Sequence, residues 1–411
     1  MTDTTAVSNK APAPGIRWAG APMATAGRLS RALTVEDLRR MARRKLPRPV
    51  FDYVDGGGEN EITMGRNSAA FDRIAFRPRT VADIAGRWQS TSFFGRPSAA
   101  PFGIGPMGGL GLLWPEADLV VARVAARAGI PYVLATGSSV SMERIAEAVP
   151  DGRRWFQLYV FSDGALNRRL LSRAASAGFE ALVVTTDTQI GPKRIRDLRS
   201  GFSLPLRLTP RSVFDFAIRP NWLWSIARHP NAGMMGNLEA EVGSPPTAAK
   251  TFDFFRTGRL RSVGWDDLKP IRDAWRGPML IKGIVTAEEA ARAVQLGVDG
   301  IVVSNHGGRN LDGTLATIDA LPEVVAAAGG LTVLLDSGIR RGSDIVKALA
   351  LGARGVLAGR AVAYALAAAG EAGVEHVVAM LHDEVDRVQG LLGCPDFERI
   401  DPSFVRREGH R

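Results

Sequence analysis

The chain has 411 residues, of which 45% are apolar and 23% charged, so wholesale disorder is excluded and a large hydrophobic core is possible. Its one cysteine, Cys394, excludes an intrachain disulfide, a cysteine-ligated zinc cluster and an iron–sulfur cluster. No run reaches the roughly 18 apolar residues of a membrane-spanning helix, so none is expected.

The chain is basic, with a net charge of +10 from 52 Lys and Arg against 42 Asp and Glu. Such a charge suits nucleic acid, an anionic membrane face or acidic substrates. Basic residues gather at 39–45 and 193–211, but neither run is interleaved with the aromatic residues that single-strand binding requires. We therefore do not expect a nucleic acid partner.

The chain begins with residues 1–33, rich in Ala, Thr, Pro and Ser, which predict a flexible tail. A helical pattern follows, because Thr34 is a good N-cap, acidic residues fill the next turn, and the pattern stops before Pro47. We expect the rest of the chain, 34–411, to form a single domain with this helical region as an N-terminal extension.

From Pro101 onward, short apolar runs bounded by Gly, Pro or Asp recur, as expected for parallel strands buried on both faces. The eight candidate strands are Pro101–Pro106, Pro131–Thr136, Trp155–Val160, Ala181–Asp187, Pro278–Gly283, Gly300–His306, Thr332–Gly338 and Gly355–Arg360.

Alanine-rich helical patterns separate most of these strands, including Glu116–Ala128, Leu166–Ala177, Ala287–Leu296 and Arg341–Leu351. Eight strands alternating with helices predict an α/β fold of the (β/α)8 TIM-barrel type. The alternative is an open, doubly wound sheet, although no Gly-x-Gly-x-x-Gly motif follows the first strand.

One connection is much longer than the others, because no strand is predicted from Thr188 to Trp265. We expect an insertion at about 203–262, after the fourth strand, and a structureless stretch of that length is usually a lid, a membrane contact or disordered. Within it, Phe214–Arg228 places two Phe and two Trp beside arginines. This pattern is typical of a membrane interface, and a small satellite core explains it equally well.

A barrel of this type carries its active site at the carboxyl ends of the strands. Polar, charged and glycine residues gather at those positions: Pro106, Met107, Gly108, Gln157, Tyr159, Thr185, Asp187, Lys282, Ser304, His306, Arg309, Asp336, Gly338, Arg340, Gly359 and Arg360. The ends of strands 7 and 8 of such barrels often bind phosphate. Gly338 and Gly359 allow close backbone approach, and Arg340 and Arg360 can bind phosphate oxygens. Too few carboxylate or histidine ligands stand there for a metal site, and none is predicted.

His306 and Lys282 are the strongest candidates for catalysis. A lone histidine is more often structural, but His306 is followed by two glycines that leave its ring uncovered, and Asp187 is a plausible carboxylate partner. Lys282 is either an exposed rim lysine or a desolvated cation that pairs with an anionic cofactor ring.

The segment Ser304–Asp312 (Ser-Asn-His-Gly-Gly-Arg-Asn-Leu-Asp) resembles the signature of the FMN-dependent α-hydroxy acid dehydrogenase and oxidase family. The resemblance runs from about Leu46 to Asp396. Further matches are Phe51–Tyr53, Trp114–Glu116, Phe156–Tyr159, Lys282–Gly283, Asp336–Gly342 and Lys347–Gly352. Trp114–Pro115, His229–Pro230 and Gly393–Asp396 look most similar to the membrane-associated mandelate and L-lactate dehydrogenases.

The resemblance implies a role for each matching residue. His306 would be the base that removes a proton from the substrate, and Asp187 would stabilise the imidazolium. Arg309 and Arg194 would bind the substrate carboxylate, and Tyr53 and Tyr159 would hydrogen-bond the substrate.

The resemblance also implies FMN as cofactor. Lys282 would stabilise the reduced flavin. Contacts to the flavin ring or ribityl chain would come from Pro106, Met107, Gly108, Gln157, Thr185 and Ser304. The ribityl chain and phosphate would be held by Asp336, Gly338, Arg340, Gly359 and Arg360.

Four positions depart from the family pattern. Ala135 stands where a serine is common, so one flavin hydrogen bond is missing unless Thr136 substitutes for it. Gly137 stands where short-chain oxidases often have Trp, which leaves room for a larger substrate side chain. Asn310 replaces a frequent Gln, and the loop around Arg194 lacks the usual Arg-Glu step.

Taken together, the resemblance implies oxidation of an L-2-hydroxy acid, mandelate-like or lactate-like, to the 2-oxo acid, with oxygen, a cytochrome or a membrane quinone as electron acceptor. The basic, aromatic segment near 207–228 favours a membrane quinone. The resemblance also implies a homotetramer at the inner face of the cell membrane, on the cytoplasmic side. Alternatives are an oxygen-using oxidase that produces hydrogen peroxide, a peptide-modifying flavoenzyme of the same family, and a non-catalytic membrane-bound scaffold.

Overall fold

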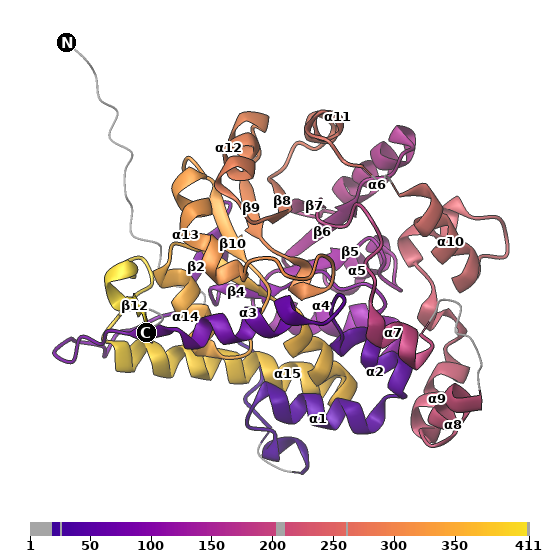
Figure 1. Ribbon diagram of the computed structural model, residues 1–411, viewed down its shortest axis with the longest axis horizontal. Coiled ribbons are helices and arrows are strands. Elements are labelled where there is room, and N and C mark those ends of the chain that lie inside the picture. The colour runs from indigo at the N-terminus through magenta and orange to yellow at the C-terminus, as the bar shows by residue number, and fades with distance from the viewer. Residues whose placement is uncertain (1–18, 25–26, 203–209, 260–261, 409–411) are drawn as a thin grey trace.

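The computed structural model describes residues 19–24, 27–202, 210–259 and 262–408. Eight parallel strands close into a barrel in the order β10-β11-β4-β5-β6-β7-β8-β9 (Figure 1). Their bounds are β4 Phe102–Ile104, β5 Tyr132–Ala135, β6 Arg154–Tyr159, β7 Ala181–Thr185, β8 Met279–Ile284, β9 Gly300–Val303, β10 Thr332–Leu335 and β11 Gly355–Ala358. Each lies within or overlaps one of the eight apolar runs, so the barrel prediction is confirmed.

Side chains from successive strands fill the barrel, which explains why the runs are apolar throughout rather than alternating. Trp155, Val183, Leu280 and Val302 are among this buried interior cluster. Phe93, outside the barrel strands, packs edge-on against Trp155 with 5.9 Å between ring centroids, and closes the amino end of the barrel.

Helices surround the barrel strands (Figure 1). They are α4 Ala117–Arg127, α5 Met142–Ala148, α6 Gly164–Ser176, α11 Trp265–Ala274, α12 Ala287–Leu296, α13 Thr317–Ala327, α14 Gly342–Ala350 and α15 Arg360–Leu392. The four helical patterns expected from the sequence correspond to α4, α6, α12 and α14. The long α15 bends at Ala369 and Gly370, which leave helical geometry.

Three helices precede the barrel: α1 Val35–Lys45, α2 Arg48–Asp55 and α3 Ile62–Asp72. Thr34 caps α1 through a capping box with Asp37, and the helix ends at Lys45, before Pro47, as expected. Residues 1–18 and 25–26 of the expected tail lie outside the described residues. Part of the remainder is fixed on α15, because Ala32 is buried and the Ala24 N–H donates to Nδ1 of His376.

Short elements complete the described fold. Strand β1 (Ile74–Phe76) pairs antiparallel with β12 (Val405–Arg407), and β2 (Thr91–Phe93) pairs with β3 (Arg96–Ser98). The 3-10 helices are η1 Leu29–Arg31, η2 Leu110–Leu112, η3 Pro230–Gly233, η4 Gly236–Glu241, η5 His306–Gly308 and η6 Pro402–Phe404. The sequence did not predict β1, β2, β3 or β12, because three residues are too few to show an alternating pattern.

The long connection between β7 and β8 is helical rather than structureless over its described residues. It contains α7 Ile195–Ser200, α8 Pro210–Ala217, α9 Pro220–Arg228 and α10 Ala248–Gly258. The expectation of an irregular stretch was wrong because proline and glycine divide it into helices too short to recognise by periodicity.

The aromatic segment of this connection has two different faces. Phe216 and Trp222 are buried and stacked, with 5.4 Å between centroids, and the Trp222 indole N–H donates to the Leu112 carbonyl. Phe214 and Trp224 point outward and are 64% and 61% exposed. The buried half packs into the hydrophobic core, and the exposed half leaves the membrane-interface interpretation a prediction. In the described part of the chain, no helix is both long and apolar enough to cross a membrane.

Candidate active site

A cavity of about 700 Å³ opens at the carboxyl ends of the barrel strands. Most of the predicted site residues line it: Tyr53, Pro106, Met107, Gly108, Gly137, Gln157, Tyr159, Thr185, Arg194, Lys282, His306, Arg309, Asp336, Gly338, Arg340, Gly359 and Arg360. The other two, Asp187 and Ser304, stand behind the wall and contact His306 and Lys282. The structure thus brings all of the predicted residues to one place.

His306 is held by the loop that follows β9. Its own φ is +57°, an uncommon conformation for a side-chain-bearing residue, and Gly307 and Gly308 follow with positive φ. The turn persists because Ser337 Oγ accepts from the Gly307 N–H and the Asn305 side chain accepts from the Gly308 N–H. The strained turn presents the imidazole to the cavity.

The imidazole is paired with a carboxylate on its inner side. Nδ1 lies 2.8 Å from Oδ1 of Asp187, and Nε2 lies 3.5 Å from the Tyr159 hydroxyl. Burial lowers the pKa of His306, while ion pairing keeps the pKa of Asp187 below its usual value against its own burial. An ionised carboxylate can only accept, so Nδ1 carries the hydrogen and Nε2 has a free lone pair at the cavity.

Lys282 is a buried cation rather than a rim lysine. Its Nζ donates to Ser304 Oγ at 2.6 Å and lies 3.1 Å from Asp336 Oδ2 and 4.0 Å from Asp187 Oδ2. Burial alone would lower the pKa of Lys282, but the two carboxylates outweigh it, so the pKa is raised and the ammonium stays charged.

Two arginines converge on one tyrosine at the cavity wall. The guanidinium carbons of Arg309 and Arg194 lie 5.0 and 5.4 Å from the Tyr53 ring centroid. Arg194 precedes α7 and pairs with Asp197 at 3.1 Å, yet its buried Nη1 has no hydrogen-bond partner of good geometry in the described structure. A carboxylate beside Tyr53 would meet both cations, as the spacing of Arg194 predicts.

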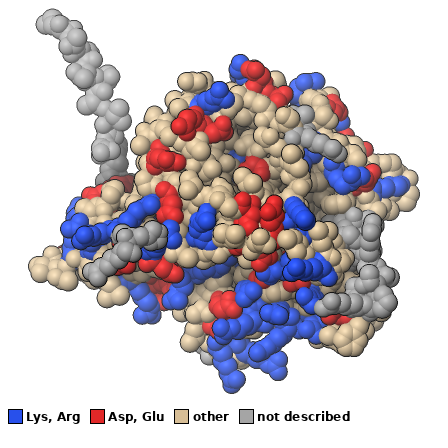
Figure 2. Space-filling model, in the orientation of Figure 1, with Lys and Arg blue, Asp and Glu red and all other residues tan. Residues whose placement is uncertain are grey.

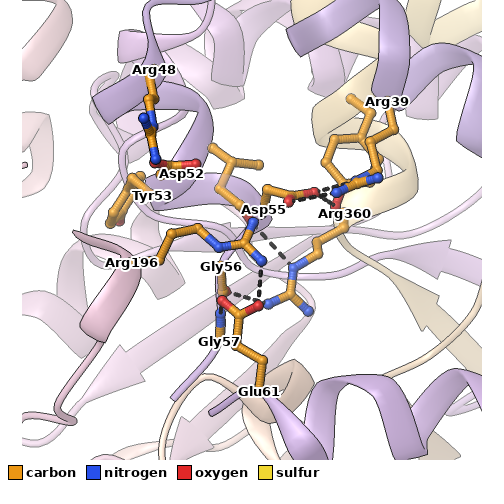
Figure 3. A network of polar contacts seen from close by, with 12 residues as sticks. Arg39, Arg48, Asp52, Tyr53, Asp55, Gly56, Gly57, Glu61, Arg196 and Arg360 are labelled. Carbon is orange, nitrogen blue, oxygen red and sulfur yellow. Dashed lines mark hydrogen bonds and ion pairs between the residues drawn. The ribbon is translucent and has the colours of Figure 1, made fainter. Parts of the chain in front are cut away.

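A network that the sequence did not predict fixes the segment carrying Tyr53 (Figure 3). The buried carboxylate of Asp55 accepts hydrogen bonds from Arg39, Tyr364 and Arg196, and Arg196 also pairs with Glu61. These arginines hold the pKa of Asp55 at about 2 against the effect of burial. Asp55 therefore links the Tyr53 segment to α7, which begins next to Arg194.

Arg360 reinforces the same segment. It donates to the carbonyls of Val54, Gly56 and Gly307 at 3.1, 2.7 and 2.6 Å, and burial lowers its pKa to about 10. Arg360 thus joins the Tyr53 segment to the His306 loop. Three of its five N–H groups donate to these carbonyls. The other two remain free to bind a phosphate, which is the role that the sequence predicts for Arg360.

The cavity also fits FMN on its own features. Gln157 Nε2 and Thr185 Oγ1 are buried and have no partner in the described structure, although such groups normally have one. A Cβ added to Gly359 would meet only Met107 Sδ, at 3.9 Å, so the start of α15 is open to a phosphate. The residues present therefore suit the polar edge of a flavin and its phosphate.

Ala135 has no hydroxyl to offer the flavin, and the hydroxyl of the neighbouring Thr136 is already in use. Thr136 Oγ1 donates to the Gln157 carbonyl at 2.7 Å and accepts from the Tyr159 N–H at 3.1 Å. The Thr136 hydroxyl therefore does not substitute for the serine that the family often has at position 135.

The insertion contributes cavity residues that sequence reasoning missed. Met234 and Met235 follow η3, and Phe252, Phe255 and Arg259 come from or follow α10. The sequence offered no local signal for them, because only the path of the chain returns this segment to the mouth of the barrel.

Comparisons with known proteins agree with this geometry. A family model described as FMN-dependent dehydrogenase matches residues 42–407. The (S)-mandelate dehydrogenase of Pseudomonas putida is 39% identical over 91% of this chain and 94% of its own length. An L-lactate dehydrogenase of Caulobacter vibrioides is 42% identical over 90% and 96%. A crystal structure described as the monotopic membrane protein (S)-mandelate dehydrogenase superposes with a TM-score of 0.87 at 39% identity, covering 92% of this chain and 99% of that one.

Proposed function

The chain belongs to the FMN-dependent dehydrogenase family, and we propose that it oxidises an L-2-hydroxy acid with a bulky, aromatic side chain to the 2-oxo acid. The electrons then pass to a membrane quinone. The observation that carries this proposal is the single cavity shared by the His306–Asp187 pair, the buried Lys282 and the two arginines beside Tyr53.

The substrate binds with its carboxylate between Arg309 and Arg194, since both guanidinium groups lie at Tyr53. Tyr159 keeps its proton, because burial raises its pKa to about 12, and its hydroxyl donates to the substrate. Nε2 of His306 takes up a substrate proton, and Asp187 stabilises the imidazolium that results.

Bound FMN supplies the chemistry that the side chains lack, because it accepts the two electrons that leave the α-carbon. Lys282 holds a fixed positive charge in the cavity, where it favours the electron-rich state of the cofactor. Gln157 and Thr185 would offer their unpaired polar atoms to the flavin edge, and Gly359 and Arg340 would hold the phosphate.

The walls of the cavity favour a large substrate side chain. A Cβ added to Gly137 would lie 3.8 Å from the Gly108 Cα and 3.8 Å from the Met235 terminal methyl, so this corner lacks side-chain bulk. Leu112, Met235 and Phe255 make the surrounding wall apolar. Mandelate-like acids suit this shape best, and lactate or longer aliphatic acids come second.

We also propose a peripheral membrane contact, which favours quinone as the electron acceptor. The exposed Phe214, Leu223 and Trp224 of α8 and α9 form an apolar surface, and α8 packs against α2. Figure 2 shows Lys and Arg side chains gathered at the lower edge of the molecule, where Figure 1 places α1. Arg39, Arg40, Arg43, Arg44, Arg48 and Arg219 line a groove there. Apolar side chains beside arginines suit an anionic lipid surface.

Anaerobic reduction of the bound flavin by a panel of 2-hydroxy acids tests the proposal. Among 2-hydroxy acids whose side chain is uncharged, we expect (S)-mandelate to reduce the flavin fastest, and a short-chain ubiquinone to reoxidise it faster than air does. Rapid reoxidation in air with peroxide release would instead identify an oxidase. A flavin that no 2-hydroxy acid reduces would refute the proposed reaction and leave the peptide-modifying alternative.

A further inference from the structure

A cation at the wall of the active-site cavity has no part in the mechanism above. Arg259 follows α10 as its C-cap residue and lines the cavity together with Phe255. Its guanidinium carbon lies 5.4 Å from the Tyr159 ring centroid and 5.7 Å from that of Phe255. Because the Tyr159 hydroxyl is 3.5 Å from Nε2 of His306, Arg259 is only one side chain away from the base.

Arg259 differs from the arginine one turn earlier in how its charge is used. Arg256 also lines the cavity, but its side chain is 57% exposed and its guanidinium pairs with Asp253 at 2.6 Å. Within the described residues, no carboxylate pairs with Arg259 and no acceptor takes a hydrogen bond from its guanidinium. Stacking on two aromatic rings holds the guanidinium in place but leaves its N–H donors for a ligand.

The surroundings of Arg259 limit what that ligand can be. The substrate carboxylate is already served by Arg194 and Arg309, which lie on the other tyrosine, Tyr53. The cavity wall near the insertion also holds the apolar Met234, Met235 and Phe252, and the charge of the remaining cation there, Arg256, is already paired with Asp253. A group that reaches Arg259 must therefore pass an apolar wall, which an aromatic ring does at little cost, and end in a hydrogen-bond acceptor.

We propose that Arg259 determines specificity by binding an acidic substituent at the far end of the substrate side chain. The preferred substrates are then arylglycolic acids that carry a second carboxylate on the ring. This inference rests on the proposed function and adds the substrate class. A charge-assisted pair in a cavity partly closed to water is stronger than an exposed one, and we expect a preference of about tenfold or more.

The experiment compares mandelate with 3- and 4-carboxymandelate as reductants of the flavin under anaerobic conditions. For the wild-type holoenzyme, kcat/KM for at least one carboxymandelate should exceed that for mandelate by about tenfold. Arg259→Met, which keeps an unbranched side chain over the two rings, should abolish this ratio, and Arg259→Lys should keep part of it. The control Arg256→Met should keep the wild-type ratio.

A binding measurement separates recognition from turnover. Phenylacetate and 4-carboxyphenylacetate lack the 2-hydroxyl group and cannot be oxidised, so their affinities for the holoenzyme can be measured by calorimetry. The ring carboxylate should tighten binding in the wild type and in Arg256→Met, but not in Arg259→Met.

The two proposals fail in different ways. If mandelate reduces the flavin and no ring carboxylate improves either kcat/KM or affinity, the role of Arg259 is refuted and the proposed reaction stands. The same holds if Arg259→Met retains the wild-type ratio. If none of the three hydroxy acids reduces the flavin, the proposed reaction fails instead.

Discussion

Nδ1 of His306 lies 2.8 Å from Oδ1 of Asp187, although 119 residues separate the two in the chain. The carboxylate fixes the tautomer of the ring and leaves Nε2 as the proton acceptor at the cavity.

Replacing His306 with Gln should leave FMN bound but almost unreduced by substrate. A positioned base contributes about 10²- to 10⁴-fold in rate. The rate of flavin reduction in anaerobic stopped-flow experiments should therefore fall by about 10²-fold or more. Flavin content, measured by absorbance, should match the wild type, and the exposed His229→Gln should behave as the wild type. Wild-type reduction rates in His306→Gln would remove the base from the mechanism.

Asp187→Asn should lower the rate and also move its pH dependence. Burial lowers the pKa of His306 and Asp187 raises it, and the net pKa is below the ordinary value of about 6.5. The acid limb of kcat/KM should therefore lie below pH 6.5, since only the neutral ring accepts a proton. Removing the carboxylate should shift the limb to lower pH, and a shift to higher pH would contradict this account.

Lys282→Met should lower the midpoint potential of the bound flavin, because the ammonium is a buried positive charge beside Asp336. A fall of roughly 30 mV corresponds to about 1.4 kcal/mol for a two-electron couple, and we expect at least this change. A spectroelectrochemical titration measures it, with the exposed Lys269→Met as control. An unchanged potential would place Lys282 outside the influence of the flavin.

Asp55→Asn should raise KM more than it lowers kcat, because Asp55 positions Tyr53 and α7 without lying at the reacting atoms. Breaking a buried pair of this kind typically costs about 3–5 kcal/mol, so the melting temperature should also fall. The matched control is Asp52→Asn. Burial raises the pKa of Asp52, so its charge is already disfavoured and a neutral amide should be tolerated better there.

The same carboxylate should contribute to acid stability. The pKa of Asp55 is about 2 in the folded protein, against about 3.9 for an unfolded aspartate. Its stabilisation is complete above the unfolded value and is lost as the pH falls toward 2. The difference in unfolding free energy between the wild type and Asp55→Asn should therefore shrink between pH 5 and pH 2. A constant difference would argue against an ionised Asp55.

Leu223→Ser with Trp224→Ser should release the enzyme from anionic vesicles while flavin reduction by substrate continues. Both side chains are exposed on α9, away from the cavity lining. Cosedimentation measures the effect, and Val81→Ser, at another exposed apolar side chain, is the control. Undiminished cosedimentation of the double variant would exclude α9 as the membrane contact.

The sequence by itself determined the barrel and most of its active site. Eight short apolar runs that alternate with helical patterns are typical of parallel strands buried on both faces, and parallel strands end on the same side. For that reason residues as distant as Gln157, Lys282 and His306 could be assigned to one mouth without coordinates. Arg194 was predicted through family spacing to bind the substrate carboxylate, and its cation lies on Tyr53 together with that of Arg309.

Only the tertiary structure decided which segments outside the barrel reach that mouth. Asp55 joins α1, α7 and α15, and Arg259 arrives at Tyr159 after an insertion of several short helices. Periodicity records which face of an element is buried, but not where a connection returns after leaving the barrel. That path depends on packing between segments far apart in the chain, such as Trp222 against the Leu112 carbonyl, and such contacts leave no local pattern to read.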